Sequence, residues 1–367
     1  MSKICVDVRM YNHSGIGKYL QMLLPGICER FDTTLLGDPA MLSPLASAAS
    51  IIPFNAPIYS ISEQRHYKKI IAATDLFWSP HYNTPIGRIR AGKRVATIHD
   101  VYHLAFSKGM SSKQRLYAKI VMNNTVKASD AIITVSVFSK NEIIRYTGCD
   151  PNKIFVIYNG VEKYPETHND TVLKTGNELP GKYILFVGNV KPHKNLRTLL
   201  KAYLLLSDTL QKNYKIVIVG KKDGFLTGDT GLFDWVNSDS RLQANVVFTG
   251  YVDERDMSAI YSNASLLVFP SVYEGFGLPP LEGMANGCPV IASDASSIPE
   301  ICGDAAMYFS PLEAQDLGVK ITTLLTDQTR REALVNNGLE RIKLFSWEEA
   351  VDKHAGLFNQ LLDQKDR

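Results

Sequence analysis

Two glutamates, Glu274 and Glu282, lie eight positions apart in the segment SVYEGFGLPPLEGMANG, residues 271–287. Carboxylates do not bind phosphate, but they accept hydrogen bonds from hydroxyl groups. A Gly-Phe-Gly sequence and a Pro-Pro pair lie between the two glutamates. The glycines allow the backbone of this segment to come close to a ligand, and the prolines suit the first turn of a helix. The spacing therefore predicts a ligand that carries hydroxyl groups on both sides of a group bound at a helix N-terminus.

The prolines at 279 and 280 predict a helix over residues 278–286, which Gly287 would end as the residue after the C-cap. The apolar run ASLLVFP precedes it, so the helix would follow the carboxyl end of a strand. Free N–H groups in the first turn of a helix bind phosphate. A nucleotide sugar fits this pattern, with its diphosphate on the helix, its sugar on one glutamate and its ribose on the other.

A bare pair of glutamates would equally fit a turn residue and a solvated helix residue. The ligand site is favoured because the strand, the glycines, the prolines and the helix follow one another in the order that such a site requires. Tyr273, between the strand and the first glutamate, is interpreted as a core aromatic residue.

Short apolar runs alternate with helical stretches along the whole chain. They are nearly continuous rather than alternating, which is typical of parallel strands covered by helices on both faces. Six such runs in each half predict two Rossmann-like α/β domains. The predicted strands lie within residues 3–10, 33–36, 75–80, 94–100, 131–136 and 153–160, and then 182–189, 214–220, 245–250, 264–270, 288–294 and 305–310.

The polar segment 162–181 lacks periodicity and is interpreted as a linker between the domains. We therefore predict an N-terminal domain over 1–165 and a C-terminal domain over 166–346. Two long helical patterns end the chain, at 329–345 and 347–362. Ser346 is the expected N-cap of the second, with Glu349 three residues later.

Composition indicates an ordered protein, with 45% hydrophobic and 21% charged residues. No signal peptide or membrane-length apolar run is present, so a cytoplasmic location is expected. Five scattered cysteines without metal-ligand spacing are predicted to be buried thiols.

Residues 1–165 hold 20 Lys and Arg against 11 Asp and Glu, whereas the remainder is acidic. The basic clusters at 65–69, 87–94 and 108–119 fit either a solvated face or an anionic membrane surface.

The segments EGFGLPPLE and GCPVIASDASSIPEICGDAA resemble the signature of retaining glycosyltransferases of family 4 with the GT-B fold. The resemblance extends over nearly the whole chain, through YILFVGNVKPHKNL, FTGYVDERDMSAIYSNA, ATIHDV and SGIGKY. The stretch WSPHYNTP is similar to one in bacterial mannosyltransferases that build O-antigen chains. The resemblance implies two domains facing each other across a cleft, with a C-terminal helix, residues 347–367, crossing back to the first.

The same resemblance implies roles for individual residues. Three catalytic residues are expected: Glu274 on the donor sugar, Lys194 on the leaving diphosphate and His99 near the sugar. The family often has an arginine at the position of Asn189, so Lys191 or His193 would supply the second positive charge. His81 and His103 are structural or acceptor-side candidates. The remaining expected donor-binding residues are Gly15, Gly17, Tyr251, Val252, Gly275, Phe276, Gly277, Leu278 and Glu282.

The implied activity is transfer of a hexose from a nucleotide sugar to a lipid-linked polysaccharide, with retention of configuration. The favoured substrates are GDP-mannose as the mannose donor and an O-antigen-like acceptor. The reaction is expected to need no metal ion and no other cofactor, and nucleic acid is not expected as a partner. A UDP- or dTDP-sugar donor and a catalytically silent nucleotide-binding subunit remain alternatives. A nucleotide-sugar epimerase on the same scaffold is a further alternative. A glucan phosphorylase on this scaffold would be expected to carry a pyridoxal-phosphate lysine motif, which is not seen in the sequence.

Overall fold

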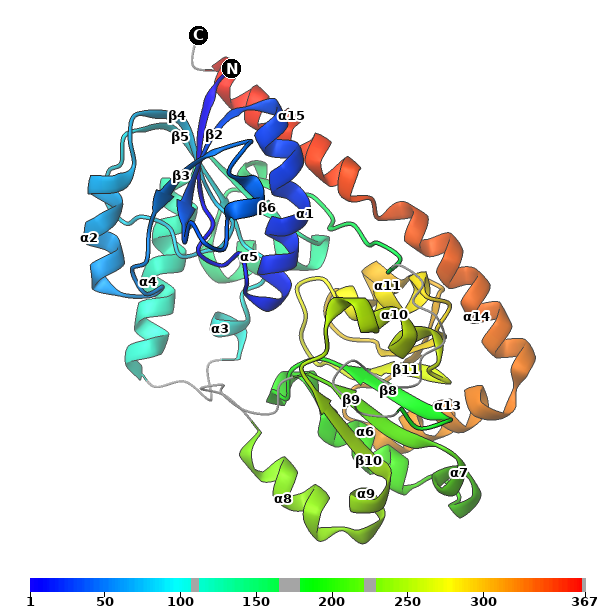
Figure 1. Ribbon diagram of the computed structural model, residues 1–367. Helices are drawn as coiled ribbons and strands as arrows, with labels where there is room; N and C mark the ends of the chain where they lie inside the picture. Colours follow the sequence, from blue (N-terminus) through cyan, green and yellow to red (C-terminus); the bar gives the residue numbers. More distant parts are fainter. Residues whose placement is uncertain (107–111, 165–178, 221–228, 365–367) are drawn as a thin grey trace. The chain divides into compact units, whose positions relative to one another are not determined.

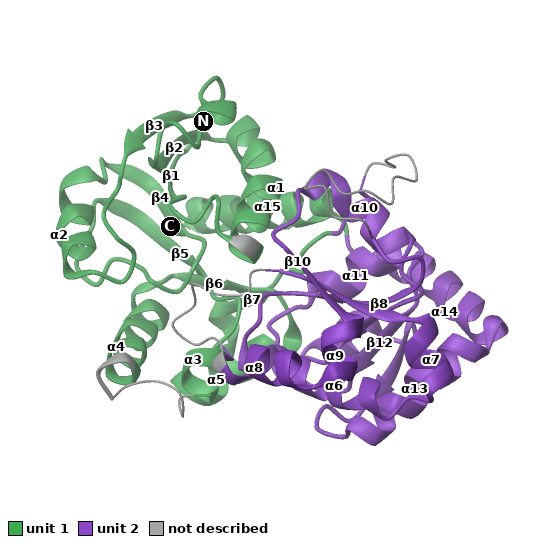
Figure 2. Cartoon of the chain, turned by 60° about the horizontal axis from the view of Figure 1, so that its bottom comes forward, with its two compact units in different colours: residues 1–160, 346–367 green, residues 161–345 purple. Residues whose placement is uncertain are grey.

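A computed structural model describes residues 1–106, 112–164, 179–220 and 229–364. The chain forms two compact units, one made of residues 1–160 and 346–367 and the other of residues 161–345 (Figure 2). Each is described separately below as unit 1 and unit 2. Much of the predicted linker lies outside the described residues.

Within the described residues, unit 1 is built on a seven-stranded parallel sheet of strand order β3-β2-β1-β4-β5-β6-β7 (Figure 1). Its strands are β1 (Lys3–Asp7), β2 (Asp32–Gly37), β3 (Ser50–Pro53), β4 (Thr74–Ser79), β5 (Ala91–Thr97), β6 (Ala131–Thr134) and β7 (Ile154–Val156). Its helices are α1 (Ser14–Arg30), α2 (Ile61–Ile70), α3 (Tyr102–Ala105), α4 (Ser112–Ala128), α5 (Val137–Thr147) and α15 (Trp347–Asp363).

Alternate residues of each central strand face opposite layers of unit 1. On β1, Ile4 and Val6 pack into a core shared with α1 and α15, whereas Cys5 faces the opposite side, toward Tyr67 of α2. Both faces are buried, which explains why the strands read as continuous apolar runs.

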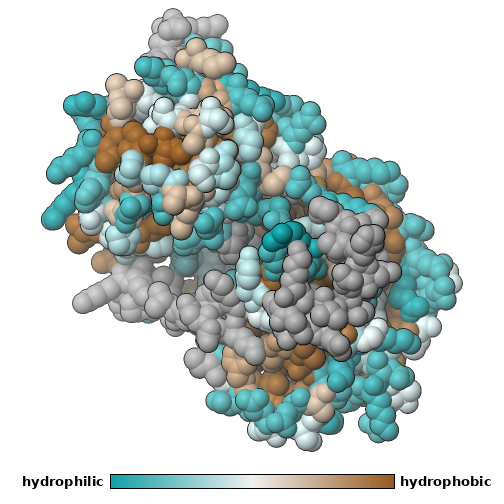
Figure 3. Space-filling model, viewed as in Figure 1, coloured by the Kyte–Doolittle hydropathy of each residue, from teal (hydrophilic) through white to brown (hydrophobic). Residues whose placement is uncertain are grey.

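The strand β3 was not predicted, because it is only partly buried and lacks the continuous apolar run of the central strands. It forms the edge of the sheet beside β2. In the view of Figure 3, apolar atoms gather over this edge amid hydrophilic residues. A short strand that ends in Pro53 offers few free backbone groups to another strand.

Unit 2 has, among the described residues, a six-stranded parallel sheet of order β10-β9-β8-β11-β12-β13. All six strands were predicted: β8 (Tyr183–Val187), β9 (Lys215–Val219), β10 (Val246–Gly250), β11 (Leu266–Phe269), β12 (Val290–Ser293) and β13 (Ala306–Phe309). The helices are α6 (Leu196–Leu204), α7 (Asp208–Asn213), α8 (Thr230–Ser238), α9 (Ser240–Asn245), α10 (Glu254–Ser262), α11 (Leu278–Ala285), α12 (Ile298–Cys302), α13 (Ala314–Thr326) and α14 (Gln328–Arg341).

The strand order reverses between β1 and β4 in unit 1 and between β8 and β11 in unit 2. Loops that leave the carboxyl ends of two such strands diverge to opposite faces of the sheet and open a crevice between them. Each sheet therefore has one position at which a ligand site is expected.

The chain passes between the units at Gly160 and returns at Ser346, earlier than the boundary predicted at 165. A Cβ atom at Gly160 would overlap the backbone of Trp347, so only glycine allows the two segments this close. Ser346 caps α15 by accepting a hydrogen bond from the Glu349 N–H at 3.2 Å, as predicted. The helix packs on α1, and His354 of α15 is fully buried in unit 1.

A buried polar cluster ties α15 to the sheet. His354 Nδ1 donates to the Ala350 carbonyl at 2.6 Å, which leaves Nε2 to accept from the Tyr19 hydroxyl at 2.6 Å. Tyr19 in turn lies 3.1 Å from the Thr97 hydroxyl, which also accepts from Trp78 Nε1 at 3.0 Å. Burial lowers the pKa of His354 from 6.5 to about 4, so the imidazole is neutral in the folded protein.

We expect this histidine to make unit 1 acid-sensitive. Between pH 6.5 and 4 the unfolded chain binds a proton at His354 that the folded chain does not, so stability falls as the pH falls through this range. The full shift corresponds to about 3 kcal/mol. In urea unfolding at pH 7.5 and pH 5, His354→Gln should therefore lose less stability on acidification than the wild type. The exposed His66 provides the control, and His66→Gln should behave as the wild type. Equal losses in His354→Gln and the wild type would contradict the assignment.

All five cysteines are buried free thiols, as predicted. None of the helices that the structure describes is long and apolar enough to cross a bilayer.

Candidate active site

The loops after β8 and β11 bring a predicted cation and a predicted carboxylate together. Lys194 ends a short 3-10 helix, Pro192–Lys194, and its Nζ lies 2.6 Å from Oε1 of Glu274. The Val272 N–H donates to the His193 carbonyl at 2.8 Å and joins the two loops directly. Residues 80 positions apart in the sequence therefore form one partly buried ion pair at the strand-order reversal of unit 2.

Backbone contacts hold Glu274 in place. Its N–H donates to the Ser296 hydroxyl at 3.0 Å, and the Ser297 hydroxyl donates to the carbonyls of Glu274 and Phe276 at 3.0 and 2.9 Å. The Phe276 ring is buried and packs edge-on against Phe345, with ring centroids 5.8 Å apart. This ring anchors the loop, so only the backbone of Phe276 can serve a ligand.

The helix α11 begins as the sequence predicts. Gly277 is its N-cap with a φ of 105°, a backbone conformation that residues with a Cβ rarely adopt. Pro279 and Pro280 occupy the first turn, and Gly287 follows the helix with a φ of 70°. Because proline has no N–H, the first turn offers an anion the backbone N–H groups of Gly277 and Leu278 together with the helix dipole, directly after the Glu274 loop.

Glu282, on α11, holds hydroxyl groups with both of its oxygens. Tyr164 donates to Oε1 at 3.0 Å and Tyr261 donates to Oε2 at 2.8 Å. The two tyrosine rings are stacked, with centroids 6.3 Å apart and an interplanar angle of 10°. Sequence patterns do not reveal Tyr164 as part of this site, because it lies far from Glu282 along the chain. A carboxylate that binds two hydroxyls here has the chemistry expected for a ribose ligand.

Tyr251 and Val252, which are expected to bind the donor, follow the carboxyl end of β10. Gly250 has a φ of 74°, which turns the chain sharply after the strand. Tyr251 is 72% exposed, whereas Val252 is buried. Of these two residues, Tyr251 can therefore offer a ligand both its backbone and its ring, whereas the Val252 side chain is not accessible.

In unit 1, His99 follows β5 and has a defined tautomer. Its Nε2–H donates to the Pro80 carbonyl at 2.9 Å, and its ring packs edge-on against Tyr19 at 4.8 Å. Burial lowers the pKa of His99, so the ring is neutral and Nδ1 carries a lone pair. A neutral imidazole of this kind accepts a hydrogen bond from a hydroxyl.

Gly15 and Gly17, which are expected to bind the donor, lie in the first turn of α1. Gly15 is exposed, and a side chain there would meet nothing. Gly17 packs on the carbonyl of Tyr11, which a Cβ atom would overlap. Gly17 is therefore required by close packing, whereas Gly15 leaves the backbone open to a ligand.

Sequence reasoning missed a buried ionic cluster beside the strand-order reversal of unit 1. Arg9 lies 2.6 Å from both Asp7 and Glu63, and the side chains of all three are almost fully buried. His81 belongs to the same cluster: its Nδ1 accepts from the Asn83 N–H at 3.1 Å, and its Nε2 lies 3.7 Å from Asp7. The available signal was the sequence Asp-Val-Arg at the end of an apolar strand, where buried charges need partners.

Comparison with known proteins shows the family of the chain. Residues 15–163 match the family model "Glycosyltransferase Family 4", and residues 171–341 match "Glycosyl transferases group 1". The chain is 30% identical to the O-antigen chain mannosyltransferase B of Escherichia coli over 81% of its own length and 76% of that protein. It is 29% identical to the serotype-specific mannosyltransferase WbdA of Escherichia coli, over 74% of this chain but only 34% of WbdA.

Solved structures show the same two-domain fold. The sucrose-phosphate synthase of Thermosynechococcus elongatus superposes with a TM-score of 0.81, covering 99% of this chain and 100% of that one at 19% identity. Anabaena Alr3699/HepE, solved with UDP-glucose, gives a TM-score of 0.73 over 98% of this chain and 100% of that chain, at 18% identity. The protein therefore belongs to the group 1 glycosyltransferase family, with the GT-B fold, and its relatives include O-antigen mannosyltransferases.

Proposed function

We propose that this glycosyltransferase transfers mannose from GDP-mannose, with retention of configuration, to a sugar hydroxyl of a lipid-linked polysaccharide such as O-antigen. The observation that carries the proposal is the Lys194–Glu274 pair directly before the N-terminus of α11, which offers a cation, a carboxylate and the backbone N–H groups of Gly277 and Leu278 in one place. The similarity to O-antigen chain mannosyltransferase B supports mannose and a polysaccharide acceptor.

The proposed reaction breaks the bond between the anomeric carbon and the diphosphate. Lys194 and the first turn of α11 stabilise the negative charge that develops on the diphosphate. Glu274 and neutral His99 hold hydroxyls of the donor sugar, and Glu282 holds the ribose. The acceptor oxygen bonds to the anomeric carbon on the face that the diphosphate leaves, and its proton passes to the leaving phosphate oxygen.

Asn189 leaves the diphosphate one positive charge short of the family pattern. The next basic residues on the loop are Lys191 and His193, which flank Pro192 at the start of the 3-10 helix that carries Lys194. We assign the second positive charge to this pair, because the hydrogen bond between the His193 carbonyl and Val272 ties their backbone to the Glu274 loop.

A donor panel tests the function. Purified protein is incubated with GDP-mannose, UDP-glucose or a dTDP-sugar and a lipid-linked glycan, and product is detected by mass spectrometry. GDP-mannose should give the highest kcat/KM, and NMR of the product should show an α-anomeric linkage. Transfer from UDP-glucose alone would replace the donor assignment. A complete lack of transfer and of donor hydrolysis with every sugar would favour a silent subunit.

We expect activity to survive excess EDTA. In the proposed site, Lys194 and the α11 dipole supply the positive charge that a metal ion supplies in other transferases. The measurement is the initial rate before and after chelation, with Mg²⁺ or Mn²⁺ added back. Loss of rate on chelation and recovery with either ion would overturn the metal-independent mechanism.

A basic and apolar surface of unit 1 fits an anionic membrane. Unit 1 holds 22 Lys and Arg against 15 Asp and Glu. The helix α2, the loop 85–90 and α4 adjoin one another, since the Ile86 N–H donates to Gln64 at 2.8 Å and Asn124 donates to the Pro85 carbonyl at 3.5 Å. Exposed basic and apolar side chains alternate on them: Ile61, Arg65, Lys68, Lys69, Ile86, Arg88, Arg90, Arg115, Leu116, Lys119 and Ile120. The beginning of the third predicted cluster, 108–111, lies outside the described residues.

Arg94, which the sequence groups with these clusters, has a structural role instead. Its guanidinium donates to the carbonyls of Gly87 and Pro85, and burial lowers its pKa. Reversing this charge would disturb the loop, so Arg94 is unsuitable as a membrane probe.

Reversal of Lys68, Lys69 and Arg90 to Glu is expected to abolish binding to anionic vesicles. Each basic residue near such a surface contributes about 1 kcal/mol, screened by salt. Vesicle co-sedimentation at low and high ionic strength measures the effect, and transfer to a short soluble acceptor should persist. Reversal of the exposed Lys201, Lys212 and Lys343 of unit 2 is the matched control. If wild-type protein ignores anionic vesicles at low salt, the surface is a solvated face.

A further inference from the structure

Two tyrosines of unit 2 hold Glu282 in the way that a ribose would. A ribose offers two neighbouring hydroxyl groups, and Glu282 already accepts from the hydroxyls of Tyr164 on Oε1 at 3.0 Å and Tyr261 on Oε2 at 2.8 Å. Burial and the Glu282 carboxylate raise the pKa of both phenols, so both keep their protons and act as donors. A nucleotide whose ribose binds Glu282 therefore meets an acceptor that is already engaged.

Tyr261 is the fixed member of this pair. It lies on α10 and is fully buried. Its ring packs beside α11, where a Cβ atom added at Gly283 would lie 3.7 Å from it. The hydrogen bond from Tyr261 to Glu282 is thus part of the packing of α10 on α11, and a ligand cannot displace it without opening the core.

Tyr164 is the member that a ligand can displace. It is half-buried and belongs to no helix or strand. The N–H of Val161, three residues earlier, donates to the Phe345 carbonyl at 3.1 Å and ties the segment to unit 2. The Tyr164 ring lies parallel to that of Tyr261, with centroids 6.3 Å apart. Such a short tether returns the hydroxyl to Glu282 at a high effective concentration.

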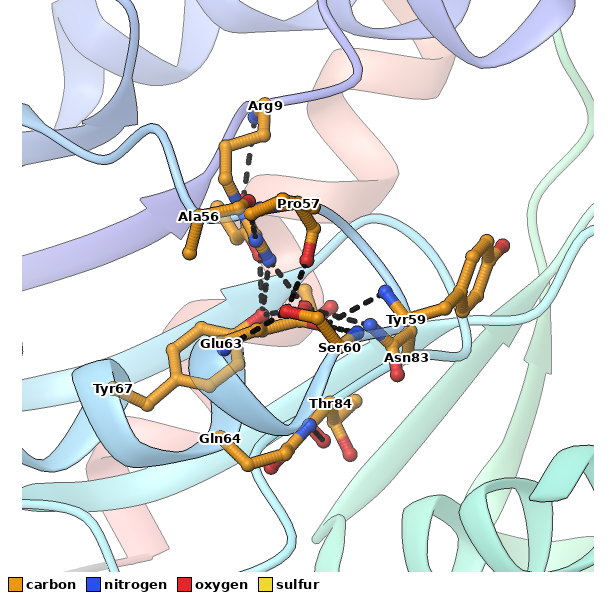
Figure 4. Close-up of polar contacts among 12 residues, drawn as sticks. Arg9, Ala56, Pro57, Tyr59, Ser60, Glu63, Gln64, Tyr67, Asn83 and Thr84 are labelled. Carbon is orange, nitrogen blue, oxygen red and sulfur yellow. Dashed lines mark hydrogen bonds and ion pairs between the residues drawn. The ribbon is translucent and has the colours of Figure 1, made fainter.

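A tyrosine–glutamate contact in unit 1 shows how a purely structural carboxylate differs. The Tyr67 hydroxyl donates to Glu63 at 3.1 Å, and Arg9 lies 2.6 Å from the same carboxylate (Figure 4). The side chain of Glu63 is completely buried, so no ligand can reach it. Glu282 is only partly buried, and a ribose can approach its oxygens from solvent.

We propose that Tyr164 is a tethered competitor of the nucleotide: its hydroxyl occupies the Glu282 oxygen that a ribose hydroxyl takes, and the donor or the nucleoside diphosphate product must displace it. The inference rests on the proposed function for the assignment of Glu282 to the ribose. Tyr164 lowers the affinity for nucleotides that carry ribose hydroxyls, whereas Tyr261 stays in place and orients the carboxylate. Removal of the Tyr164 hydroxyl therefore strengthens nucleotide binding, whereas removal of a group that supports the site would weaken it.

Calorimetric titration of wild type and Tyr164→Phe with GDP and with 2′,3′-dideoxy-GDP tests this proposal, with UDP and its dideoxy form titrated alongside. Tyr164→Phe keeps the ring on Tyr261 and should fold as the wild type does. It should bind GDP about three- to tenfold more tightly, the size of one hydrogen bond. Dideoxy-GDP has no ribose hydroxyl for Glu282, so its affinity should be the same in both proteins. Tyr214→Phe, at another half-buried tyrosine of unit 2, is the control and should bind GDP as the wild type does.

The outcomes separate the inference from the proposed function, because transfer is measured in the same samples. Nucleotide binding by Tyr164→Phe that is unchanged or weaker overturns the competition, even if GDP-mannose is the donor. An equal gain for the dideoxy nucleotide also overturns it, since the ribose would not be the cause. If the protein uses a UDP-sugar instead and Tyr164→Phe tightens UDP binding, the proposed donor is wrong and the role of Tyr164 stands. Wild-type protein that binds neither GDP nor UDP refutes both.

Discussion

Glu274→Ala is expected to lower kcat for hexosyl transfer by about 100- to 1000-fold while changing nucleotide affinity little, as is typical when a preorganised polar partner of the transition state is lost. In the proposed site this carboxylate holds the sugar that undergoes reaction and also pairs with Lys194 at 2.6 Å. Removing it loses a sugar contact and leaves the ammonium group without its fixed partner. Steady-state kinetics and nucleotide titration of the same protein separate kcat from affinity.

Glu282→Ala provides the contrast, because its proposed partner is the ribose, which takes no part in bond breaking. It should weaken nucleotide binding by about 1–3 kcal/mol, the range for a charge-assisted hydrogen bond. The Tyr164 and Tyr261 hydroxyls already occupy its two oxygens, so some of the loss reflects their rearrangement.

The Lys194–Glu274 pair can be tested as a unit. Lys194→Ala should reduce kcat to a similar extent, and the double variant should lose far less than the product of the two single effects. Small and equal effects of Glu274→Ala and Glu282→Ala on both rate and affinity would remove the basis for both assignments.

Arg9→Met is expected to destabilise unit 1 by about 3–5 kcal/mol, the typical penalty for breaking a buried ion pair. The substitution leaves Asp7 and Glu63 buried without their cation and removes the hydrogen bond to Ala56. Urea unfolding at pH 7.5 measures the loss. Arg30→Met, which breaks an exposed pair with Asp352, is the control and should change stability little.

The pH dependence identifies the cause of this loss. Arg9 and its hydrogen bonds hold the pKa of Asp7 well below its usual range in the wild type, against the effect of burial. Without Arg9, burial should raise the pKa of Asp7 above its unfolded value. Protonation would then favour the folded variant as the pH falls, and the deficit relative to wild type should shrink between pH 7.5 and pH 5. A deficit that is independent of pH would point to lost packing alone.

The sequence alone determined the features that depend on local backbone chemistry and periodicity. Continuous apolar runs predicted six strands of each sheet, because strands buried on both faces carry apolar residues at every position. Gly277, the two prolines and Gly287 predicted α11 and its ends, since few residues other than glycine adopt a positive φ and proline suits only the first turn of a helix. The edge strand β3 was missed because a strand that is only partly buried lacks a continuous apolar run.

Only the tertiary structure decided which charged groups become partners. Lys194 and Glu274 meet because β8 and β11 are neighbours in the sheet although 80 positions separate the two side chains. The Arg9, Asp7 and Glu63 cluster depends on α2 packing beside the end of β1. Periodicity and turn chemistry act over a few residues, whereas a hydrogen bond or an ion pair forms wherever the topology places its two groups within about 3 Å.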